Sequence, residues 1–415
     1  MLGTGLESQA RRVVAREGGF IERPIGAGEF QLAYVRTGTS GGMPVVVLPG
    51  GPGLASALPY AGMRKLAASR GLDVVMVEHR GVGLSGTTVD GERLPPEAVT
   101  VEAAADDVAA VLDHLNVAKA IIAGSSYGSY LAQVFAIRHP SRVHALVLDS
   151  PMLSPQADLE ATRRWRRSLL WDGSSAETRE AAALVRRLAG QGEPIEALGH
   201  VVQLVYEFAG AQTLARLLQA RLNGRLGWLW GRLATLGTGE IDGKGTPFYM
   251  EPDPVAGISF GQLGSGLPLD GGPLDPQTLF GSIAANKPPF RGTPVDLETE
   301  VPCYSWPVVV LSGDRDLRTP RPVAQQIVNM APQCVLVPLA DTGHSALDTH
   351  QLAFIQTLVI LQDQGVDGLT DTADRLADLP HKGASGMLGP ILTALIGVAT
   401  AIPVPRLGRP LRARE

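Results

Sequence analysis

The stretch KAIIAGSSYGSYLA, residues 119–132, decides the fold because it centres a G-x-S-x-G pattern on Ser126. A serine nucleophile in this pattern needs an apolar strand running into it and a helix leaving it, with the serine on the sharp turn between them. The preceding AKAIIAG is short, apolar and contains two β-branched residues, which is typical of a buried strand. After the serine, apolar residues recur at close to helical spacing until Pro140 ends the run. The sequence therefore predicts a strand–turn–helix unit with Ser126 on the turn.

A second match to the pattern provides a control within the same chain. GISFG, residues 257–261, centres on Ser259. PDPVA precedes it and QLGSGLPLDGG follows it, and both flanks read as loop because of their proline and glycine content. We therefore predict that Ser126, and not Ser259, is the nucleophile.

The pattern around residues 119–132 extends in both directions as an alternation of short apolar runs and helical stretches. It covers Phe30 to Ser150 and resumes near Trp306, and such alternation predicts an α/β protein with a mostly parallel sheet and helices on both faces. The predicted strands lie within 29–38, 44–51, 72–81, 118–124, 143–151, 307–316 and 334–344, and the clearest helices within 101–115, 129–140, 321–330 and 350–364.

The segment between these two blocks changes character. Residues 162–222 are helical in pattern and rich in arginine and leucine, whereas residues 237–292 are dense in glycine and proline. We interpret this as an inserted helical cap with a loop-rich return. The predicted organisation is a first part of the core over 1–150, the cap over 151–302, a second part of the core over 303–370, and a tail over 371–415.

The tail combines an uncharged stretch, residues 383–405, with four arginines in RLGRPLRARE. Three prolines leave only ILTALIGVATAI, residues 391–402, as an unbroken apolar run, which is too short to span a membrane. We expect surface docking or a disordered tail, and peripheral membrane association or self-association is the less favoured alternative.

Composition narrows the function classes. The net charge is −5 and no basic stripe interleaved with aromatic residues is present, which argues against a nucleic-acid partner. Two cysteines, Cys303 and Cys334, fit no metal spacing and no disulfide framework, so we expect reduced core thiols and a cytoplasmic location. The first 19 residues contain no continuous apolar run of the kind found in a secretory signal. Nothing in the sequence calls for a metal or a cofactor.

A serine nucleophile needs a base to take its proton and an acid to orient that base. In sheets of this type both come from loops at the carboxyl ends of later strands, in the chain order serine, acid, histidine. His344 follows the strand CVLVPLAD and is the predicted base, whereas His79 follows a strand but precedes Ser126. The strand PVVVLSG ends in DRD, so spacing leaves Asp314 and Asp316 nearly level as the acid, with Asp341 a distant third.

The negatively charged oxygen of an acyl-transfer intermediate needs two backbone N–H groups. One is expected from Tyr127, the residue after the nucleophile. The other is expected from PGGPG, residues 49–53, where glycines let the backbone approach a substrate, and we select Gly51.

Five motifs taken together resemble the prolyl iminopeptidase family of α/β-hydrolase peptidases: PGGPG, EHRGVGLSG, GSSYGS, GDRDLRTP and TGHS, over roughly Val45 to His344. The family shows HGGPG, D-Q-R-G-x-G-x-S, G-x-S-W-G-[GS], G-x-x-D-x-x-[TC]-P and G-x-G-H. Matching Gly313, Thr319 and Pro320 to the fourth motif selects Asp316 as the acid. This chain departs from the family where Pro49, Glu78, His79, Tyr127 and Asp341 replace its His, Asp, Gln, Trp and Gly.

The resemblance implies a metal-independent serine aminopeptidase with an α/β-hydrolase fold that releases N-terminal residues, proline among them, from small peptides. Family members bind the substrate's free amino group with acidic side chains, some of them in the cap. Glu207 and Glu251, the latter with Asp253 close by, are the candidates here. The main alternative is an esterase, lactonase or amidase that acts on a small molecule with the same triad. A ligand receptor without catalysis is a third, less favoured reading.

Overall fold

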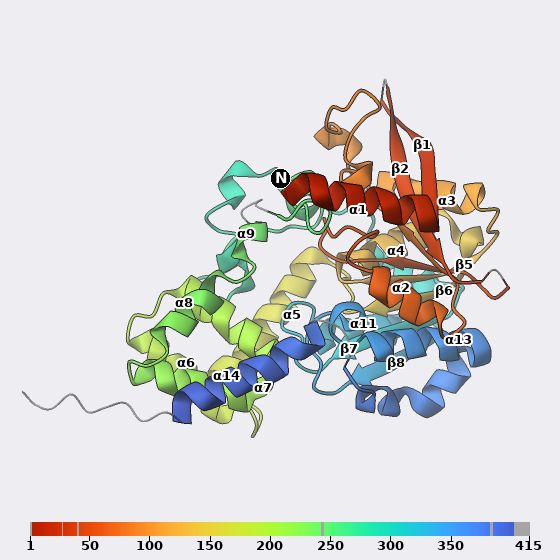
Figure 1. Ribbon diagram of the computed structural model, residues 1–415. Coiled ribbons are helices and arrows are strands. Elements are labelled where there is room, and N and C mark those ends of the chain that lie inside the picture. The colour runs from red at the N-terminus through yellow and green to blue at the C-terminus, as the bar shows by residue number, and fades with distance from the viewer. Residues whose placement is uncertain (1, 27, 40, 242–244, 382–384, 402–415) are drawn as a thin grey trace, which may run out of the picture.

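The computed structural model describes residues 2–26, 28–39, 41–241, 245–381 and 385–401, and its centre is one eight-stranded sheet (Figure 1). The strand order is β1-β2-β4-β3-β5-β6-β7-β8. β1 pairs antiparallel with β2, and β2 antiparallel with β4, while all other neighbours are parallel. The bounds are β1 Gly18–Ile25, β2 Gly28–Thr37, β3 Val45–Leu48, β4 Val74–Val77, β5 Ala120–Ser125, β6 Val143–Asp149, β7 Val308–Gly313 and β8 Cys334–Leu339.

Helices bury both faces of this sheet, which explains why the central strands are buried at nearly every position and are mostly apolar. On β5, Ile122 packs with the helices α3 (Val101–His114), α4 (Tyr127–Arg138) and α11 (Arg321–Met330). Its neighbour Ile121 packs on the opposite face. The helices on that face are α1 (Leu2–Glu17), α2 (Ala61–Ala68) and α13 (Gln351–Thr372).

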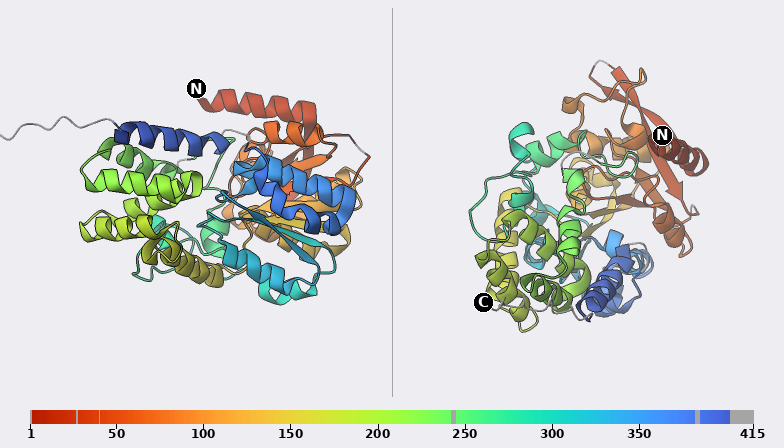
Figure 2. Two further views of the ribbon diagram at one scale, coloured as in Figure 1. Left: turned by 90° about the horizontal axis from the view of Figure 1, so that it is seen from below. Right: turned by 60° about the vertical axis from the view of Figure 1, so that its left-hand side comes forward.

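The chain leaves the sheet after β6 and returns at β7. The intervening helices lie to one side of the sheet (Figures 1 and 2), and those between residues 165 and 235 share their own apolar cluster. They are α5 (Pro155–Arg167), α6 (Arg179–Gly190), α7 (Ile195–Leu222), α8 (Gly227–Thr235) and α9 (Thr238–Ile241), followed by short helical turns and α10 (Leu297–Glu300). The predicted fold class, a mostly parallel sheet with an inserted helical cap, is confirmed.

After α13 the chain crosses back to the cap as α14 (Leu388–Ala401), which lies along α7 (Figure 1). Leu392 and Ile396 are buried in the cap cluster, and Gly389 approaches α7 so closely that a Cβ there would lie 2.0 Å from the Phe208 carbonyl oxygen. This part of the tail is therefore docked on the protein surface. The arginine-rich end, within residues 402–415, lies outside the described residues. In the described part of the chain, no helix has both the length and the apolar content needed to cross a membrane.

The expectation about the cysteines is wrong in part. Both thiols are free, but Cys303 is exposed in a short turn, and Cys334, on the edge strand β8, is half-buried and packs against the border of the core. Ser259 lies in a π-helical turn, Gly257–Gln262, and the segments on both sides of this turn are turns and loop, as predicted.

Candidate active site

Ser126 occupies a strained turn between β5 and α4. Its φ of 53° and ψ of −122° lie in a region that non-glycine residues rarely adopt, and its amide donates to the Asp149 carbonyl oxygen at 2.9 Å. The two glycines of the motif are sterically required. A Cβ on Gly124 would lie 2.0 Å from the Gly128 oxygen, and a Cβ on Gly128 would lie 2.0 Å from the Leu48 oxygen. The close approach of three backbone segments thus holds the serine on its turn.

Gly128→Ala is expected to lower the free energy of unfolding by about 2 kcal/mol or more, because the added methyl group meets backbone that cannot move aside. Gly62→Ala is the matched control, since Gly62 also lies in a helix but is exposed and has open space around its Cβ position. That control should be neutral, or stabilising by up to about 1 kcal/mol through helix propensity. Urea denaturation of the three proteins measures both effects, and equal stability of the two variants would contradict this account of the turn.

His344 is held by Asp316 at the carboxyl end of the sheet. The His344 Nδ1 atom lies 3.0 and 3.1 Å from the two Asp316 carboxylate oxygens. Burial alone would raise the pKa of Asp316, but the positive charge and hydrogen bond of His344 and two backbone amides lower it overall. Burial would likewise lower the pKa of His344, and Asp316 raises it overall. An ionised Asp316 therefore accepts a hydrogen bond from Nδ1–H, which leaves the Nε2 lone pair free to act as a base.

The other two acids left open by spacing have different partners. An Asp314 carboxylate oxygen accepts from the Thr342 amide at 3.3 Å. Asp341 pairs with Arg315, and its side chain is largely exposed. Of these three acids, Asp316 is the one hydrogen-bonded to His344, and it is the acid selected by the family resemblance.

The loop after β3, residues 49–53, lies against the serine. Gly50 is buried there, and a Cβ on it would lie 3.2 Å from Ser126 Cβ and 3.8 Å from Ser126 Oγ. Gly51 comes next with a φ of 114° and folds back toward Gly53. Gly50 is therefore the glycine of this loop that lies against Ser126, and the sequence analysis did not select it. Gly51 and Tyr127 remain the predicted amide donors to the reacting oxygen.

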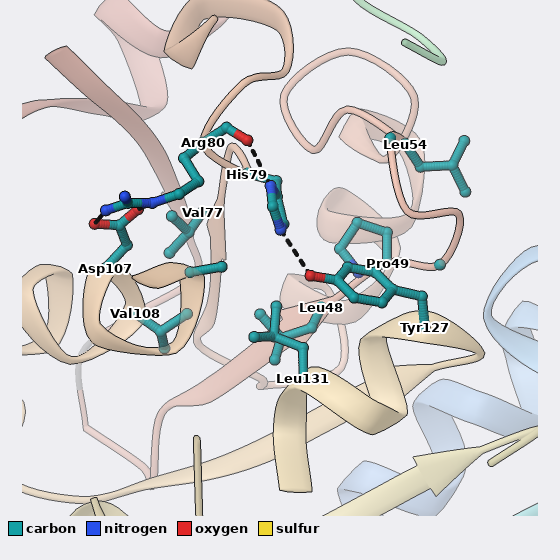
Figure 3. Close-up of a pocket in the computed structure, with 13 residues that line it drawn as sticks. Leu48, Pro49, Leu54, Val77, His79, Arg80, Asp107, Val108, Tyr127 and Leu131 are labelled. Carbon is teal, nitrogen blue, oxygen red and sulfur yellow. Dashed lines mark hydrogen bonds and ion pairs between the residues drawn. The ribbon is translucent and has the colours of Figure 1, made fainter. Parts of the chain in front are cut away.

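His79 and Tyr127, two of the residues at which this chain departs from the family motifs, contact each other (Figure 3). His79 Nδ1 lies 2.6 Å from the Arg80 carbonyl oxygen, which can only accept, so Nδ1 carries the proton. Nε2 then accepts from the Tyr127 hydroxyl at 2.7 Å. Burial lowers the pKa of His79 to about 4, which favours this neutral form. The pair borders a small, mainly apolar pocket lined by Leu48, Pro49, Leu54, Val77, Val108 and Leu131, among others.

A second pocket contains His344, and its empty volume is about 620 Å³ with the solvent at its mouth included. Glu207 reaches it from α7, and Gly389 and Pro390 border it from the start of α14. Glu207 is buried, accepts from the Leu317 amide at 3.2 Å and pairs with the Arg318 guanidinium at 3.3 Å. The structure thus brings Glu207, one of the two predicted cap acids, to the histidine.

Glu251, the other predicted cap acid, binds backbone amides of its own loop and of the segment after β4. One of its carboxylate oxygens accepts from the Phe248 amide at 2.8 Å and from the Gly83 amide at 3.1 Å. Ser259, the control serine, follows no strand, and its amide bonds to the Val255 oxygen within its own turn. Within the described residues there is no group of three or more His, Cys, Asp or Glu side chains placed to hold a metal ion.

Sequence reasoning also missed Asp149 and Ser150, which end β6. The Asp149 carboxylate accepts from the amides of Ala346 and Leu347 at 2.9 Å each, and the Ser150 hydroxyl accepts from the Ser345 amide at 2.9 Å. Their position at the end of an apolar strand could have indicated them. Polar residues that follow such a parallel strand lie at the same carboxyl end of the sheet as the other functional loops.

Comparisons with known proteins agree with this architecture. A family model described as alpha/beta hydrolase fold matches residues 43–188. The proline iminopeptidase of Heyndrickxia coagulans is 32% identical over 136 residues, which cover 33% of this chain and 43% of that protein. The proline iminopeptidase of Neisseria gonorrhoeae is 30% identical over 134 residues, covering 31% and 41% respectively, so the match spans less than half the length of these relatives. The crystal structure of VinJ superimposes with a TM-score of 0.51 at 18% identity, covering 84% of this chain and 99% of VinJ.

Proposed function

Since this chain has the α/β-hydrolase fold and is similar in sequence to proline iminopeptidases, we propose that it is a serine hydrolase that releases N-terminal residues, proline included, from small peptides. The observation that carries the proposal is the buried Asp316–His344 pair. It lies at the carboxyl end of the sheet, where Ser126 occupies its strained turn. The paired histidine is the group that a serine hydroxyl requires to become a nucleophile.

In the proposed mechanism, Ser126 Oγ attacks the carbonyl carbon of the scissile bond while His344 Nε2 takes the hydroxyl proton. Asp316 stabilises the histidine cation that forms. The amides of Tyr127 and Gly51 bind the oxyanion, and one such donor contributes about 3 kcal/mol to transition-state stability. His344 then gives the proton to the leaving amine, and water releases the acyl group from Ser126 by the same steps in reverse.

Recognition of the free amino group is assigned to Glu207, because this residue lines the pocket that contains His344. We expect aminoacyl anilides with a free amino group to be cleaved, and their N-acetylated counterparts at least about 30-fold more slowly, because a buried carboxylate that faces a neutral acetamide has lost its charged partner. The comparison of kcat/KM for the two substrates measures this.

Glu207→Gln should reduce kcat/KM for free-amine substrates by about tenfold or more relative to a small neutral ester. The ratio of the two substrates removes any general loss of folded enzyme. Glu251→Gln is the comparison variant, since Glu251 bonds to the amides of Gly83 and Phe248. If the unmodified protein turns over acetylated substrates or neutral esters as well as free-amine peptides, the aminopeptidase proposal fails.

One observation favours the alternative, an esterase, lactonase or amidase of small molecules. Glu207 already pairs with Arg318, which offsets part of the negative charge that an ammonium group would seek. The same substrate panel decides between the two. A fluorophosphonate probe tests the third reading, a non-catalytic receptor, because only an activated serine reacts with it. A cytoplasmic location stays a prediction from cysteine usage.

A further inference from the structure

The last residue of β6 and the residue after it contact the segments that carry all three proposed catalytic groups. The Asp149 carbonyl oxygen accepts from the Ser126 amide at 2.9 Å. The Ser150 carbonyl oxygen accepts from the hydroxyl of Thr319, in the acid's loop, at 2.9 Å. The Ser150 hydroxyl accepts from the amide of Ser345, which follows the histidine. These two residues therefore join three loops that are distant in the sequence.

The Asp149 side chain makes the strongest of these connections. It is 1% exposed, and its two oxygens each accept one amide, from Ala346 and Leu347, immediately after the His344 segment. Hydrogen bonds to a buried carboxylate are shorter and stronger than those between neutral groups. Asp149 thus fixes the nucleophile's turn with its backbone and the histidine's segment with its side chain.

A parallel set of hydroxyl contacts supports the same segment. The Ser125 hydroxyl donates to Ser345 Oγ at 2.8 Å, and Ser345 Oγ donates to Asp348 at 2.6 Å. The Tyr60 hydroxyl donates to the other Asp348 oxygen at 2.8 Å. The residue before the nucleophile and the residue after the histidine are therefore in direct contact.

We propose that Asp149 is a positioning residue whose ionised carboxylate holds the His344 segment at the correct distance from the Ser126 turn. The proposal rests on the proposed serine-hydrolase function. Asp149 does not touch the substrate, and it acts on the rate through the placement of the histidine. A displacement of about 1 Å in such a group can cost about 100-fold in rate.

The charge of Asp149 gives this role a pH signature. Burial raises the pKa of Asp149 to about 6, and the amides of Leu347 and Ala346, the Ser125 hydroxyl and His344 offset this only in part. The titratable groups that interact with it are His344 and Tyr60, and the hydroxyl of Tyr60 also donates to Asp348. As the pH falls through about 6, the carboxyl gains a proton and can no longer accept both amides fully. Burial lowers the pKa of His344 but Asp316 raises it overall, so protonation of His344 begins at a higher pH, and activity should fall further as Asp149 gains its proton.

Asp149→Asn is expected to lower kcat by about 10- to 100-fold with KM changed by less than about twofold. The acid limb of kcat/KM should move to lower pH, because the variant lacks both the titration of Asp149 and its negative charge near His344. Asp158→Asn is the matched control. Asp158 is also a buried carboxylate that accepts a backbone amide, from Leu153 at 2.8 Å, and burial raises its pKa to about 7, but it belongs to α5 of the cap. Its substitution should leave kcat and the pH profile unchanged.

The rate of reaction with a fluorophosphonate probe separates this proposal from the function on which it rests. Absence of labelling in the unmodified protein would sink both. Labelling of the unmodified protein together with equally fast labelling and an unchanged kcat of folded Asp149→Asn would overturn the positioning role alone. If Asp149→Asn does not fold, Ser125→Ala decides the matter, since it removes the hydroxyl that donates to Ser345 and also interacts with the Asp149 carboxylate. A several-fold loss of kcat in Ser125→Ala supports the proposal, and an unchanged kcat contradicts it.

Discussion

Ser126→Ala is expected to lower kcat by about 10⁶-fold, because removal of the nucleophile of a triad costs about as much as removal of the whole triad. The variant should keep its fold. Alanine and serine are strained to a similar degree at the positive φ of this turn, and the flanking glycines are unchanged. Steady-state kinetics on the best substrate of the peptide and ester panel measures the loss, and thermal unfolding verifies the fold.

Ser259→Ala is the control within the same G-x-S-x-G pattern, and its kcat should stay within about twofold of the unmodified protein. Ser259 makes backbone hydrogen bonds to the nearby residues Val255 and Ser265 and does not follow a strand. The reverse ranking of the two variants would remove the basis for the whole catalytic assignment.

Asp316→Asn is expected to lower kcat by about 10⁴-fold, since the analogous change in a serine protease triad leaves the geometry intact and selects the wrong histidine tautomer. An asparagine NH₂ group facing His344 Nδ1 favours protonation at Nε2, which removes the lone pair that must take the serine proton. Single-turnover and steady-state rates across the pH range measure the effect.

Asp314→Asn separates the triad acid from its neighbour two residues earlier. The Asp314 carboxylate accepts a 3.3 Å bond from the Thr342 amide, and an asparagine oxygen can also accept that bond. We expect a loss of a few-fold at most. Equal losses in the two variants would mean that the alignment of GDRD with the family motif is shifted.

The central part of the fold could be predicted because its strands are short apolar runs bounded by turn residues, which is how strands buried on both faces appear in a sequence. The helix predicted for 321–330 has those bounds in the structure. Local signals were sufficient for these elements.

The elements that were missed have weak local signals. β1 contains two glycines and a proline and is half-exposed along its length, and α1 precedes the region where the alternation begins. Site contacts were missed for a different reason. The Asp149 carboxylate and the amides that it binds are almost 200 residues apart in sequence, so only the folded sheet brings them together.

The cap residues show the same limit. Glu207 could be selected as an acid in the cap, but its pairing with Arg318 depends on how α7 meets the loop after β7. The contact between His79 and Tyr127 explains why two departures from the family pattern occur together, since each supplies the other's hydrogen-bond partner. Neither contact has a signature in spacing or composition.

The most direct test of the central claim is to treat the protein with a fluorophosphonate and locate the modified residue by mass spectrometry. The account predicts one adduct, on Ser126, that forms more slowly as the pH falls and His344 becomes protonated. An adduct on Ser259, or no adduct on a correctly folded protein, would contradict it.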